Sequence, residues 1–395
     1  MERLVHAVAL PPGRPLYQAL ETALDGGGPA ICPLPPDLPA PALDAVLAAL
    51  RPAAVVTAAG TRAYARAGER APAPPVPDGT AVLIATSGST GEPKIVELSA
   101  DALRHSATAS LRRLGAGPGD GWLCCLPTSH IAGIQVLVRS LVAGTEPIIH
   151  ERFDEAAVAR RAAGRHVALV PTQLRRMLDA GADLAAPATI LLGGAAAPPG
   201  LIEAARAAGG RVVTTYGMTE TCGGCVYDGM PLDGVSVDVG ADGLIRLAGP
   251  VLFSGYRLRP DLTAAARRGR WFITGDLGTI DGDGALRVLG RADDVINTGG
   301  EKVVAGAVER ALATHPAVKD VAVVGRPDPE WGQRVVAVVV PAAAGTGPAL
   351  DELRAWVRAR LPACAAPREL ELTDAIPLLP SGKPDRERLR RHRHP

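Results

Sequence analysis

The stretch AVLIATSGSTGEPK, residues 81–94, joins a short apolar run to a nine-residue loop with two glycines, four hydroxyls and a lysine. Glycines let the backbone wrap around an anion, hydroxyls donate hydrogen bonds, and Lys94 adds positive charge. We therefore expect this loop to hold a phosphate group. It differs from the common P-loop, because the G-x4-G-K-[ST] spacing is absent and Pro93 stands directly before the lysine. On its own, the loop would also fit a flexible Ser/Gly turn.

Short apolar runs alternate with amphipathic segments on both sides of this loop, which indicates a layered α/β fold. The clearest segments are AVLIA (81–85), LVPTQLRRMLDA (169–180), TILLGG (189–194) and RVVTTYG (211–217). After about residue 291 the pattern changes to helix, strand, strand, helix, as in VVAGAVERALATH followed by VKDVAVVG. We expect an N-terminal α/β domain over residues 1–290 and a small C-terminal α+β domain over residues 291–395.

Composition limits the partners and the compartment. Among 395 residues, 42 Lys and Arg nearly balance 41 Asp and Glu, so nucleic acid and anionic membranes are not expected as main partners. Six unevenly spread cysteines do not suggest a disulfide scaffold, and no apolar run approaches the roughly 18 residues of a membrane span. No signal-peptide pattern begins the chain. We expect a cytoplasmic protein that acts on small molecules, and we leave open whether it is a homodimer.

Five further stretches follow the glycine loop in a fixed order. They are LPTSHIAG (126–133), LLGGAAAPP (191–199), TTYGMTETCGG (214–224), FITGDLG (272–278) with GRADDVINTGGEKV (290–303), and PLLPSGKPDR (377–386). With the loop, this set resembles the adenylate-forming superfamily of acyl-CoA ligases, peptide-synthetase adenylation domains and luciferases, over residues 82–386. The resemblance implies a large N-terminal α/β domain with a small mobile C-terminal domain, and ATP, Mg²⁺ and CoA as cofactor and co-substrates. It also implies a reaction that joins a carboxylate to the α-phosphate of ATP, releases pyrophosphate and passes the acyl group to a thiol.

The resemblance assigns most of the site to ATP. The implied ATP-binding residues are Thr86, Ser87, Gly88, Ser89, Thr90, Gly91, Gly193, Gly194, Ala195, Tyr216, Gly217, Asp276, Arg291 and Lys302. Their chemistry is suitable: the aromatic face of Tyr216 suits adenine, although core packing would also explain it. The carboxylate of Asp276 suits the two ribose hydroxyls, and Arg291 matches the second ribose contact of the family.

The implied catalytic residues are Lys94, Thr219, Glu220 and Lys383. Glu220 is a hard oxygen ligand of the kind that Mg²⁺ prefers, and Thr219 is implied near the α-phosphate. Lys383 can bridge the carboxylate and the α-phosphate as charge builds, and loss of such a donor typically lowers the rate by about 10² to 10³. A solvated tail lysine is the alternative for Lys383, because a basic tail follows it.

The C-terminal motifs imply movement and CoA binding. Since Lys383 lies near the end of the small domain, the resemblance implies that this domain turns between the two steps, with Asp293 as the hinge. Gly299 and Gly300 are then presented to the pantetheine arm of CoA, and Lys302 matches a basic phosphate contact. One position departs from the family pattern: Ile95 follows Lys94 where the family usually has glycine, which puts the exit of the loop in doubt.

The acid substrate is indicated by Arg139, which interrupts the apolar run IAGIQVLVRSLVAG (131–144). If this run is a helix, Arg139 shares a face with Gln135, four residues before it. A guanidinium in such a segment needs a partner. That partner is either a structural Asp or Glu or a second carboxylate on the substrate. His130 resembles the aromatic or histidine gate of the acyl pocket, although a core histidine is the alternative.

A substrate with two carboxylates favours one branch of the superfamily, the o-succinylbenzoate-CoA ligases of menaquinone biosynthesis. The stretches IQVLVRSLVAGT, VPTQLRR and TYGMTETCGGCVYDG all resemble that family. The resemblance implies that the succinyl carboxylate is adenylated while Arg139 binds the ring carboxylate.

Other functions remain open at the level of sequence. A ligase for another aromatic or medium-chain acid would keep every ATP residue, and a carrier-protein-loading adenylation enzyme would differ only in the acceptor. A non-catalytic regulator would be expected to lose Lys383 or Glu220, and both are present. The CGGC stretch, Cys222–Cys225, has the spacing of zinc and redox sites, but no second Cys/His pair follows at metal spacing. We expect these side chains to line the loop after Glu220.

Overall fold

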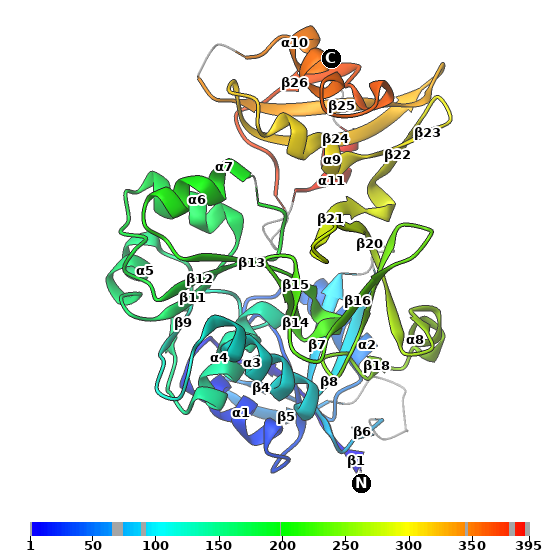
Figure 1. The fold of residues 1–395 in the computed structure, drawn as a ribbon. Coiled ribbons are helices and arrows are strands. Elements are labelled where there is room, and N and C mark those ends of the chain that lie inside the picture. Colours follow the sequence, from blue (N-terminus) through cyan, green and yellow to red (C-terminus); the bar gives the residue numbers. More distant parts are fainter. Residues whose placement is uncertain are drawn as a thin grey trace. The chain divides into compact units, whose positions relative to one another are not determined.

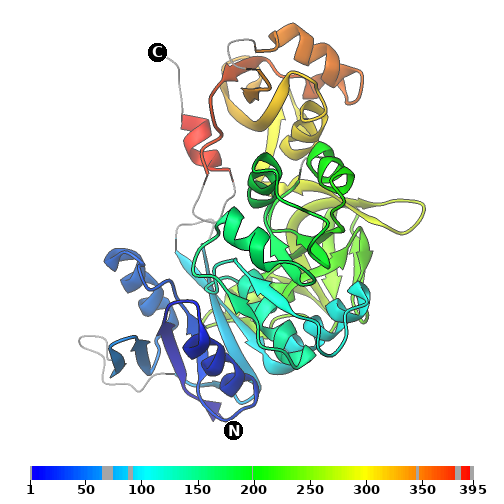
Figure 2. The same cartoon turned by 90° about the vertical axis from the view of Figure 1, so that its left-hand side faces the viewer.

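The computed structural model describes residues 2–64, 74–87, 92–197, 199–343, 347–378 and 384–391. The chain divides into two compact units, whose elements are labelled in Figure 1 and seen from a second side in Figure 2. Unit 1 comprises Met1–Gly194, Ala205–Val237 and Leu247–Phe272, and unit 2 comprises Ala195–Ala204, Asp238–Arg246 and Ile273–Pro395. Within the described ranges, no helix is both long and apolar enough to cross a membrane.

A seven-stranded sheet of unit 1 surrounds the apolar run that precedes the glycine loop, in the order β18-β8-β7-β3-β2-β4-β5. Its strands are β2 (Val5–Ala9), β3 (Ala30–Pro33), β4 (Ala54–Thr57), β5 (Gly60–Ala63), β7 (Thr80–Ser87), β8 (Pro93–Ser99) and β18 (Gly255–Tyr256). Strands β4, β2, β3 and β7 are parallel, and the other three pair antiparallel. Helices α1 (Arg14–Leu24) and α2 (Ala40–Leu50) connect the parallel strands. Residues 81–84 of β7 are fully buried, as a central strand covered on both faces requires.

The second seven-stranded sheet of unit 1 has the order β10-β9-β11-β12-β13-β14-β15. Its strands are β9 (Trp122–Cys124), β10 (Ile148–Ile149), β11 (His166–Leu169), β12 (Thr189–Leu192), β13 (Val212–Met218), β14 (Gly223–Tyr227) and β15 (Met230–Pro231). The pairs from β10 to β13 are parallel and the last two are antiparallel. Its crossover helices are α4 (Ile131–Ala143), α5 (Glu155–Arg161), α6 (Pro171–Asp179) and α7 (Pro199–Ala207). Because β12 and β13 are parallel, Gly193 and Gly194 after β12 and Thr219 and Glu220 after β13 follow strand ends at the same edge of the sheet.

Helix α3 (Ala100–Leu114) lies between these two sheets, packed against α4 and against β7, β8 and β14 (Figure 1). The helix begins after Ser99, whose side-chain oxygen accepts a hydrogen bond from the backbone N–H of Ala102 at 3.1 Å. It ends at Gly115, which adopts a left-handed conformation. Two serines on its buried side, Ser106 and Ser110, are completely covered, so α3 carries hydroxyl groups into the interior of unit 1.

Two smaller sheets complete the part of the chain before residue 292. One pairs β1 (Glu2–Arg3) with β6 (Val76–Pro77). The other has the order β16-β17-β20-β19, and β21 also pairs with β20, antiparallel. Its strands are β16 (Ser236–Val239), β17 (Leu244–Ala248), β19 (Arg267–Arg268), β20 (Trp271–Ile280) and β21 (Leu286–Arg291), and the short helix α8 (Pro260–Ala265) precedes β19.

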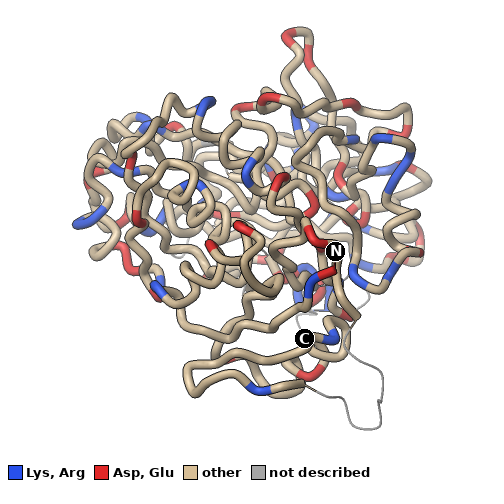
Figure 3. Tube along the Cα trace, turned by 90° about the horizontal axis from the view of Figure 1, so that it is seen from below, with Lys and Arg blue, Asp and Glu red and all other residues tan. Residues whose placement is uncertain are grey.

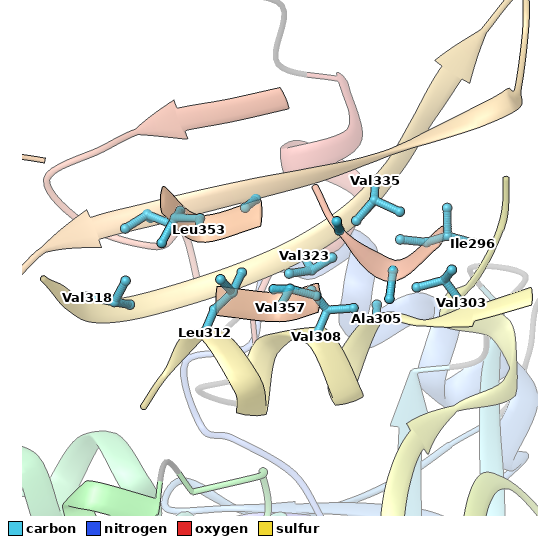
Figure 4. Close-up of a cluster of buried hydrophobic side chains, with 14 residues drawn as sticks. Ile296, Val303, Ala305, Val308, Leu312, Val318, Val323, Val335, Leu353 and Val357 are labelled. Carbon is cyan, nitrogen blue, oxygen red and sulfur yellow. The ribbon is translucent and has the colours of Figure 1, made fainter. Parts of the chain in front are cut away.

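The sheet of unit 2 has the order β23-β22-β25-β24, with β26 parallel to β25. Its strands are β22 (Val295–Thr298), β23 (Glu301–Val304), β24 (Val318–Asp328), β25 (Gly332–Pro341) and β26 (Glu369–Leu372), with helices α9 (Ala305–Leu312), α10 (Leu350–Arg358) and α11 (Arg386–Arg391). One face packs Val323 and Val335 against α9 and α10, as Figure 4 shows. The other face packs Val324 and Val336 with Leu389 of α11. Burial on both faces explains why these strands are continuous apolar runs.

The α/β fold class predicted from the sequence is confirmed, and the helix, strand, strand, helix pattern after residue 291 corresponds to α9, β24, β25 and α10. The predicted boundary between domains at residues 290 and 291 stays a prediction. Acidic and basic residues are interspersed along the described chain (Figure 3), as the formal net charge of +1 suggests.

Candidate active site

Strands β7 and β8, which flank the glycine loop in the chain, pair antiparallel. Thr86 pairs with Lys94, Ser87 pairs with Pro93, and the Thr86 hydroxyl donates to the carbonyl of Lys94 at 3.1 Å. The predicted phosphate contacts Gly88, Ser89, Thr90 and Gly91 lie outside the described residues. Ile95, the departure from the family pattern, pairs with Ala85 in regular strand and its side chain is buried. The loop therefore exits into an ordinary strand, and an isoleucine is suitable there because it enters the core.

Small residues are required where β12 and β13 end. A Cβ atom on Gly193 would lie 2.2 Å from Oγ1 of Thr215, and one on Gly217 would lie 2.0 Å from the carbonyl oxygen of Gly223. Gly194 and Ala195 follow directly after Gly193. Tyr216 is half-buried in β13, opposite Val226 of β14, so it is not enclosed in the core.

The TETC segment turns tightly from β13 into β14. A short 3-10 helix, η1 (Thr219–Thr221), is fixed by the hydroxyl of Thr221, which accepts from the N–H of Met218 at 2.9 Å and donates to the carbonyl of Gly223 at 2.7 Å. Cys222 then takes a left-handed conformation. Thr219 and Glu220 are half-buried at the tip of this turn, with their positions set by a closed hydrogen-bond pattern.

Glu220 is held at both its backbone and its side chain. Its carbonyl oxygen accepts from the N–H of Phe253 at 2.8 Å, and its Oε1 accepts from the hydroxyl of Tyr256 at 2.8 Å. Burial, and then the charge and hydrogen bond of Glu220, raise the pKa of Tyr256, so the phenol is a donor at neutral pH. The Nζ atom of Lys94 lies 5.9 Å from the centre of the Tyr256 ring. Tyr256 was not singled out in the sequence analysis, although a tyrosine directly after a glycine, as in SGYRLRP, could have indicated a functional residue.

The carboxylate of Glu220 fits a magnesium site. Within the described ranges no Lys, Arg or His forms an ion pair with it, so no described cation neutralises its charge. The described residues contain no group of three or more His, Cys, Asp or Glu side chains that could hold a metal. Mg²⁺ is commonly bound through one or two carboxylates together with substrate phosphates and water, so a single glutamate suits it.

Two predicted ribose contacts of unit 2 come together. Asp276 of β20 is directly opposite Arg291 of β21, and Oδ1 of Asp276 lies 3.5 Å from Nε of Arg291. Arg291 also donates from Nη2 to Oδ2 of Asp293, the predicted hinge residue, at 3.3 Å. The guanidinium thus joins the predicted ribose carboxylate to the predicted hinge.

The predicted CoA-binding glycines form the turn between β22 and β23. Gly299 and Gly300 both have positive φ angles, and the N–H of Gly299 donates to the carbonyl of Trp331 at 2.9 Å. Lys302 is exposed on β23, opposite Asn297. The turn is exposed, and a Cβ atom on Gly299 would lie 2.6 Å from the indole ring of Trp331.

Lys383 lies outside the described residues, but the residues that flank its segment do not. Leu378 pairs with Pro384, and the N–H of Asp385 donates to the carbonyl of Pro377 at 2.8 Å. Three residues beyond Lys383, Arg386 forms ion pairs with Asp294 at 3.1 Å and with Glu309 at 2.8 Å. The assignment of Lys383 as the catalytic lysine stays a prediction.

The predicted acyl-binding residues lie on α4 and directly before it. His130 is exposed at the start of the helix, which excludes the core-histidine alternative. Gln135 is buried, and its Nε2 donates to the carbonyl of Leu103 at 3.4 Å, while its Oε1 has no hydrogen-bond donor among the residues the structure describes. Arg139 is on the same helix face and is 5% exposed.

The described neighbours of Arg139 are uncharged groups. Its Nε donates to the hydroxyl of Ser110 at 2.9 Å and its Nη2 to the hydroxyl of Tyr227 at 3.3 Å, and these two hydroxyls are 2.7 Å apart. The guanidinium lies 5.1 Å from the ring centre of Trp122. No Asp or Glu of the described segments is within ion-pair distance, so the structural partner left open by the sequence is not found there. Ser110, Tyr227 and Trp122 were not singled out in the sequence analysis. For Ser110, the placement of two serines four residues apart on the buried side of α3 could have indicated a polar partner in the interior.

The cysteines of the CGGC stretch are ordinary buried thiols. Cys222 and Cys225 are fully buried, and burial raises the pKa of Cys225 to about 12. The thiolate needed for zinc binding or redox chemistry is therefore disfavoured.

Comparison with known proteins gives matches along both units. The chain matches the AMP-binding enzyme family over residues 12–256 and the AMP-binding enzyme C-terminal domain over residues 307–383. A probable 2-succinylbenzoate–CoA ligase of Mycobacterium tuberculosis is 46% identical over 362 residues, which cover 88% of this chain and 93% of the relative. A feruloyl-CoA synthase of Amycolatopsis sp is 35% identical over 336 residues, which cover 78% of this chain and 68% of the relative.

Solved structures also match almost the whole of this chain. The amide bond synthetase McbA from Marinactinospora thermotolerans has a TM-score of 0.85 at 28% identity, covering 98% of this chain and 89% of its own. The o-succinylbenzoate CoA synthetase MenE from Bacillus subtilis, in complex with the acyl-adenylate intermediate OSB-AMP, has a TM-score of 0.81 at 27% identity, covering 98% and 88%. The same synthetase was also solved with ATP and a magnesium ion. The predicted fold of the adenylate-forming type is thereby confirmed.

Proposed function

Because this chain belongs to the AMP-binding enzyme family, we propose that it is an acid–CoA ligase that converts 2-succinylbenzoate, ATP and CoA to 2-succinylbenzoyl-CoA, AMP and pyrophosphate. The first step joins the succinyl carboxylate to the α-phosphate of ATP and releases pyrophosphate. In the second step the CoA thiol attacks the acyl carbon and AMP leaves. With ATP and CoA as co-substrates, the cytoplasm is the compartment we propose.

ATP binding is assigned to the motifs of both units. In unit 1, the β7–β8 hairpin with Lys94 is proposed to hold the phosphates, Tyr216 the adenine, and Thr219 the α-phosphate. In unit 2, Asp276 and Arg291, whose charged groups lie 3.5 Å apart, are proposed to bind the ribose. Mg²⁺, when bound, would neutralise phosphate charge, and Glu220 is the residue that would hold it.

The C-terminal residues are assigned to the reacting groups. Lys383 is proposed to stabilise the charge that builds between the carboxylate and the α-phosphate. The exposed glycine turn of Gly299 and Gly300 is proposed to contact the pantetheine arm, with Lys302 as a phosphate contact. Residues 291–395 are proposed to turn about Asp293 between the two steps.

The observation that carries the choice of acid is the neutral environment of Arg139. The described partners of this buried guanidinium are two hydroxyls and an indole ring, and a carboxylate placed beside it would be strongly attracted. The ring carboxylate of 2-succinylbenzoate meets that requirement, and the likeness to 2-succinylbenzoate–CoA ligases agrees with it.

A ligase for another aromatic acid is the second candidate, because a feruloyl-CoA synthase is also among the relatives. A mixture of 2-succinylbenzoate, ferulate, benzoate, 4-phenylbutyrate and octanoate, incubated with the protein, ATP, Mg²⁺ and CoA, separates the two by mass detection of CoA thioesters. Thioester on 2-succinylbenzoate alone is expected. Thioester on ferulate or another acid instead would keep the ligase and discard this substrate, and acyl-AMP without thioester would point to another acceptor.

A further inference from the structure

Tyr256 connects the two charged groups that the proposed function assigns to the phosphates and to the metal. Its hydroxyl donates to Oε1 of Glu220 at 2.8 Å, and its ring centre lies 5.9 Å from Nζ of Lys94. We propose that Tyr256 is a positioning residue for Glu220: it fixes one carboxylate oxygen and leaves the other for the metal ion of Mg²⁺·ATP. This inference rests on the proposed function.

The backbone of Tyr256 is fixed by strand pairing. Tyr256 is the last residue of β18 and is opposite Val96 of β8. Strand β8 (Figure 1) also contains the loop residue Lys94, next to its first residue, Pro93. Its N–H donates to the hydroxyl of Thr263 at 2.9 Å. Tyr256 therefore belongs to the same sheet as β7 and β8, the strands that flank the glycine loop.

The ring of Tyr256 is fixed by aromatic packing. Its centre lies 5.0 Å from the ring centre of Phe253, which is 1% exposed and lies 5.3 Å from the ring of Phe272 in an edge contact. Phe253 also donates its backbone N–H to the carbonyl of Glu220 at 2.8 Å. The segment from Phe253 to Tyr256 thus binds Glu220 at its main chain and at its carboxylate, which restricts the side chain to one orientation.

A neutral donor is what a metal carboxylate needs from its neighbour. A phenol O–H orients Oε1 without neutralising the negative charge, whereas a lysine or arginine in the same position would compete with the cation. The other oxygen, Oε2, accepts no hydrogen bond from a described residue. Residues that orient metal ligands in this way typically change metal affinity or activity by about 10- to 100-fold when they are replaced.

The test compares Tyr256→Phe with Tyr17→Phe in the full-length protein. Both variants remove one tyrosine hydroxyl from unit 1, but the Tyr17 hydroxyl donates to the carbonyl of Thr145 at 3.1 Å and has no role in the proposed site. Calorimetry measures the Kd of α,β-methylene-ATP, a non-reactive analogue, at saturating Mg²⁺ and in EDTA. For Tyr256→Phe we expect about a tenfold weaker Kd in Mg²⁺ and an unchanged Kd in EDTA, while Tyr17→Phe matches wild type in both.

The second part of the test measures the same Kd values for Glu220→Gln, alone and combined with Tyr256→Phe. If Tyr256 acts through Glu220, adding Tyr256→Phe to Glu220→Gln should weaken binding by less than about twofold, because the group that the phenol orients has lost its charge. Thr263→Val loosens the backbone of Tyr256 without altering its ring, and it is expected to cause the same Mg²⁺-specific loss on a smaller scale. This variant keeps the test valid should Tyr256→Phe unfold, which the thermal midpoint reports.

The inference is overturned if Tyr256→Phe binds the Mg²⁺ analogue like wild type, if it loses the same factor in EDTA, or if its effect persists in full on Glu220→Gln. These outcomes leave the proposed function intact, provided that wild type binds the analogue and forms a CoA thioester. Wild-type protein that binds no analogue in Mg²⁺ would overturn the proposed function and the inference together.

Discussion

Arg139 of unit 1 and Arg326 of unit 2 are almost equally buried, at 5% and 4% exposed, but their surroundings differ. Arg326 pairs with Glu369 and Glu371, each at 2.6 Å, and donates to the carbonyl of Leu389 at 2.8 Å. Arg139 has only hydroxyl partners and an indole ring within the described chain. Removing one member of a buried ion pair strongly destabilises a fold, whereas a buried charge without a carboxylate partner is available to a ligand.

The largest effect should follow from removing the unmatched charge. Arg139→Met is expected to lower kcat/KM for 2-succinylbenzoate by about 10³-fold or more, because a site built around a charged partner rejects its absence strongly. Binding of α,β-methylene-ATP should be unchanged, since the residues proposed for ATP are elsewhere. Steady-state thioester formation and calorimetry measure the two quantities. Full activity of Arg139→Met would contradict the proposal that Arg139, unlike Arg326, binds the substrate.

Removing the matched charge should act on stability. Arg326→Met leaves Glu371, which is 8% exposed, without its cation, and we expect a loss of about 3–5 kcal/mol in the free energy of unfolding of unit 2. Arg354→Met is the control, because the ion-pair partner of Arg354 among the described residues is the exposed Asp351, at 3.9 Å, and its loss should cost less than about 1 kcal/mol. Denaturant unfolding followed by fluorescence measures both. Equal losses in the free energy of unfolding would show that the buried ion pairs of Arg326 stabilise unit 2 no more than the exposed pair of Arg354 does.

Arg139→Met, unlike Arg326→Met, should not destabilise the protein. We expect the free energy of unfolding to change by less than about 1 kcal/mol, or to rise, because the variant removes a buried charge without a carboxylate partner. The hydroxyls of Ser110 and Tyr227 remain bonded to each other at 2.7 Å. Denaturant unfolding of this variant beside Arg326→Met therefore sharpens the comparison. A loss as large as that of Arg326→Met would make Arg139 a structural residue.

The smallest effect concerns pH. Burial tends to raise the pKa of Glu369, but hydrogen bonds and charges from Arg334 and Arg326 outweigh it, so this pKa lies below its ordinary value of 4.5. A lowered pKa in the folded state means that the carboxylate stabilises unit 2 above about pH 4.5, and that this contribution is lost as pH falls through the folded pKa. Unfolding midpoints measured from pH 6 to pH 3 should fall less steeply for Glu369→Gln than for wild type. Parallel slopes would contradict the contribution of Glu369.

Much of the fold could be predicted because its signals are local. The apolar run at 81–85 and the predicted strand at 318–325 appear as β7 and β24, and the apolar run at 131–144 that Arg139 interrupts appears as α4. The arrangement of side chains around Arg139 and Glu220 could not be predicted. Ser110, Trp122 and Tyr227 reach Arg139 from three separate elements, and Tyr256 reaches Glu220 only because β18 pairs with β8. Such contacts depend on long-range packing, which a single sequence does not record.

The central claim, that the charge of Arg139 is reserved for a second carboxylate on the substrate, is tested most directly with the wild-type protein. The measurement is a competition, followed by mass detection of CoA thioesters, between 2-succinylbenzoate and 4-oxo-4-phenylbutanoate, which lacks only the ring carboxylate. We predict that the diacid is preferred by about 10³-fold or more in kcat/KM, and that Arg139→Met abolishes this preference. Equal turnover of the two acids by the wild-type protein would contradict the account.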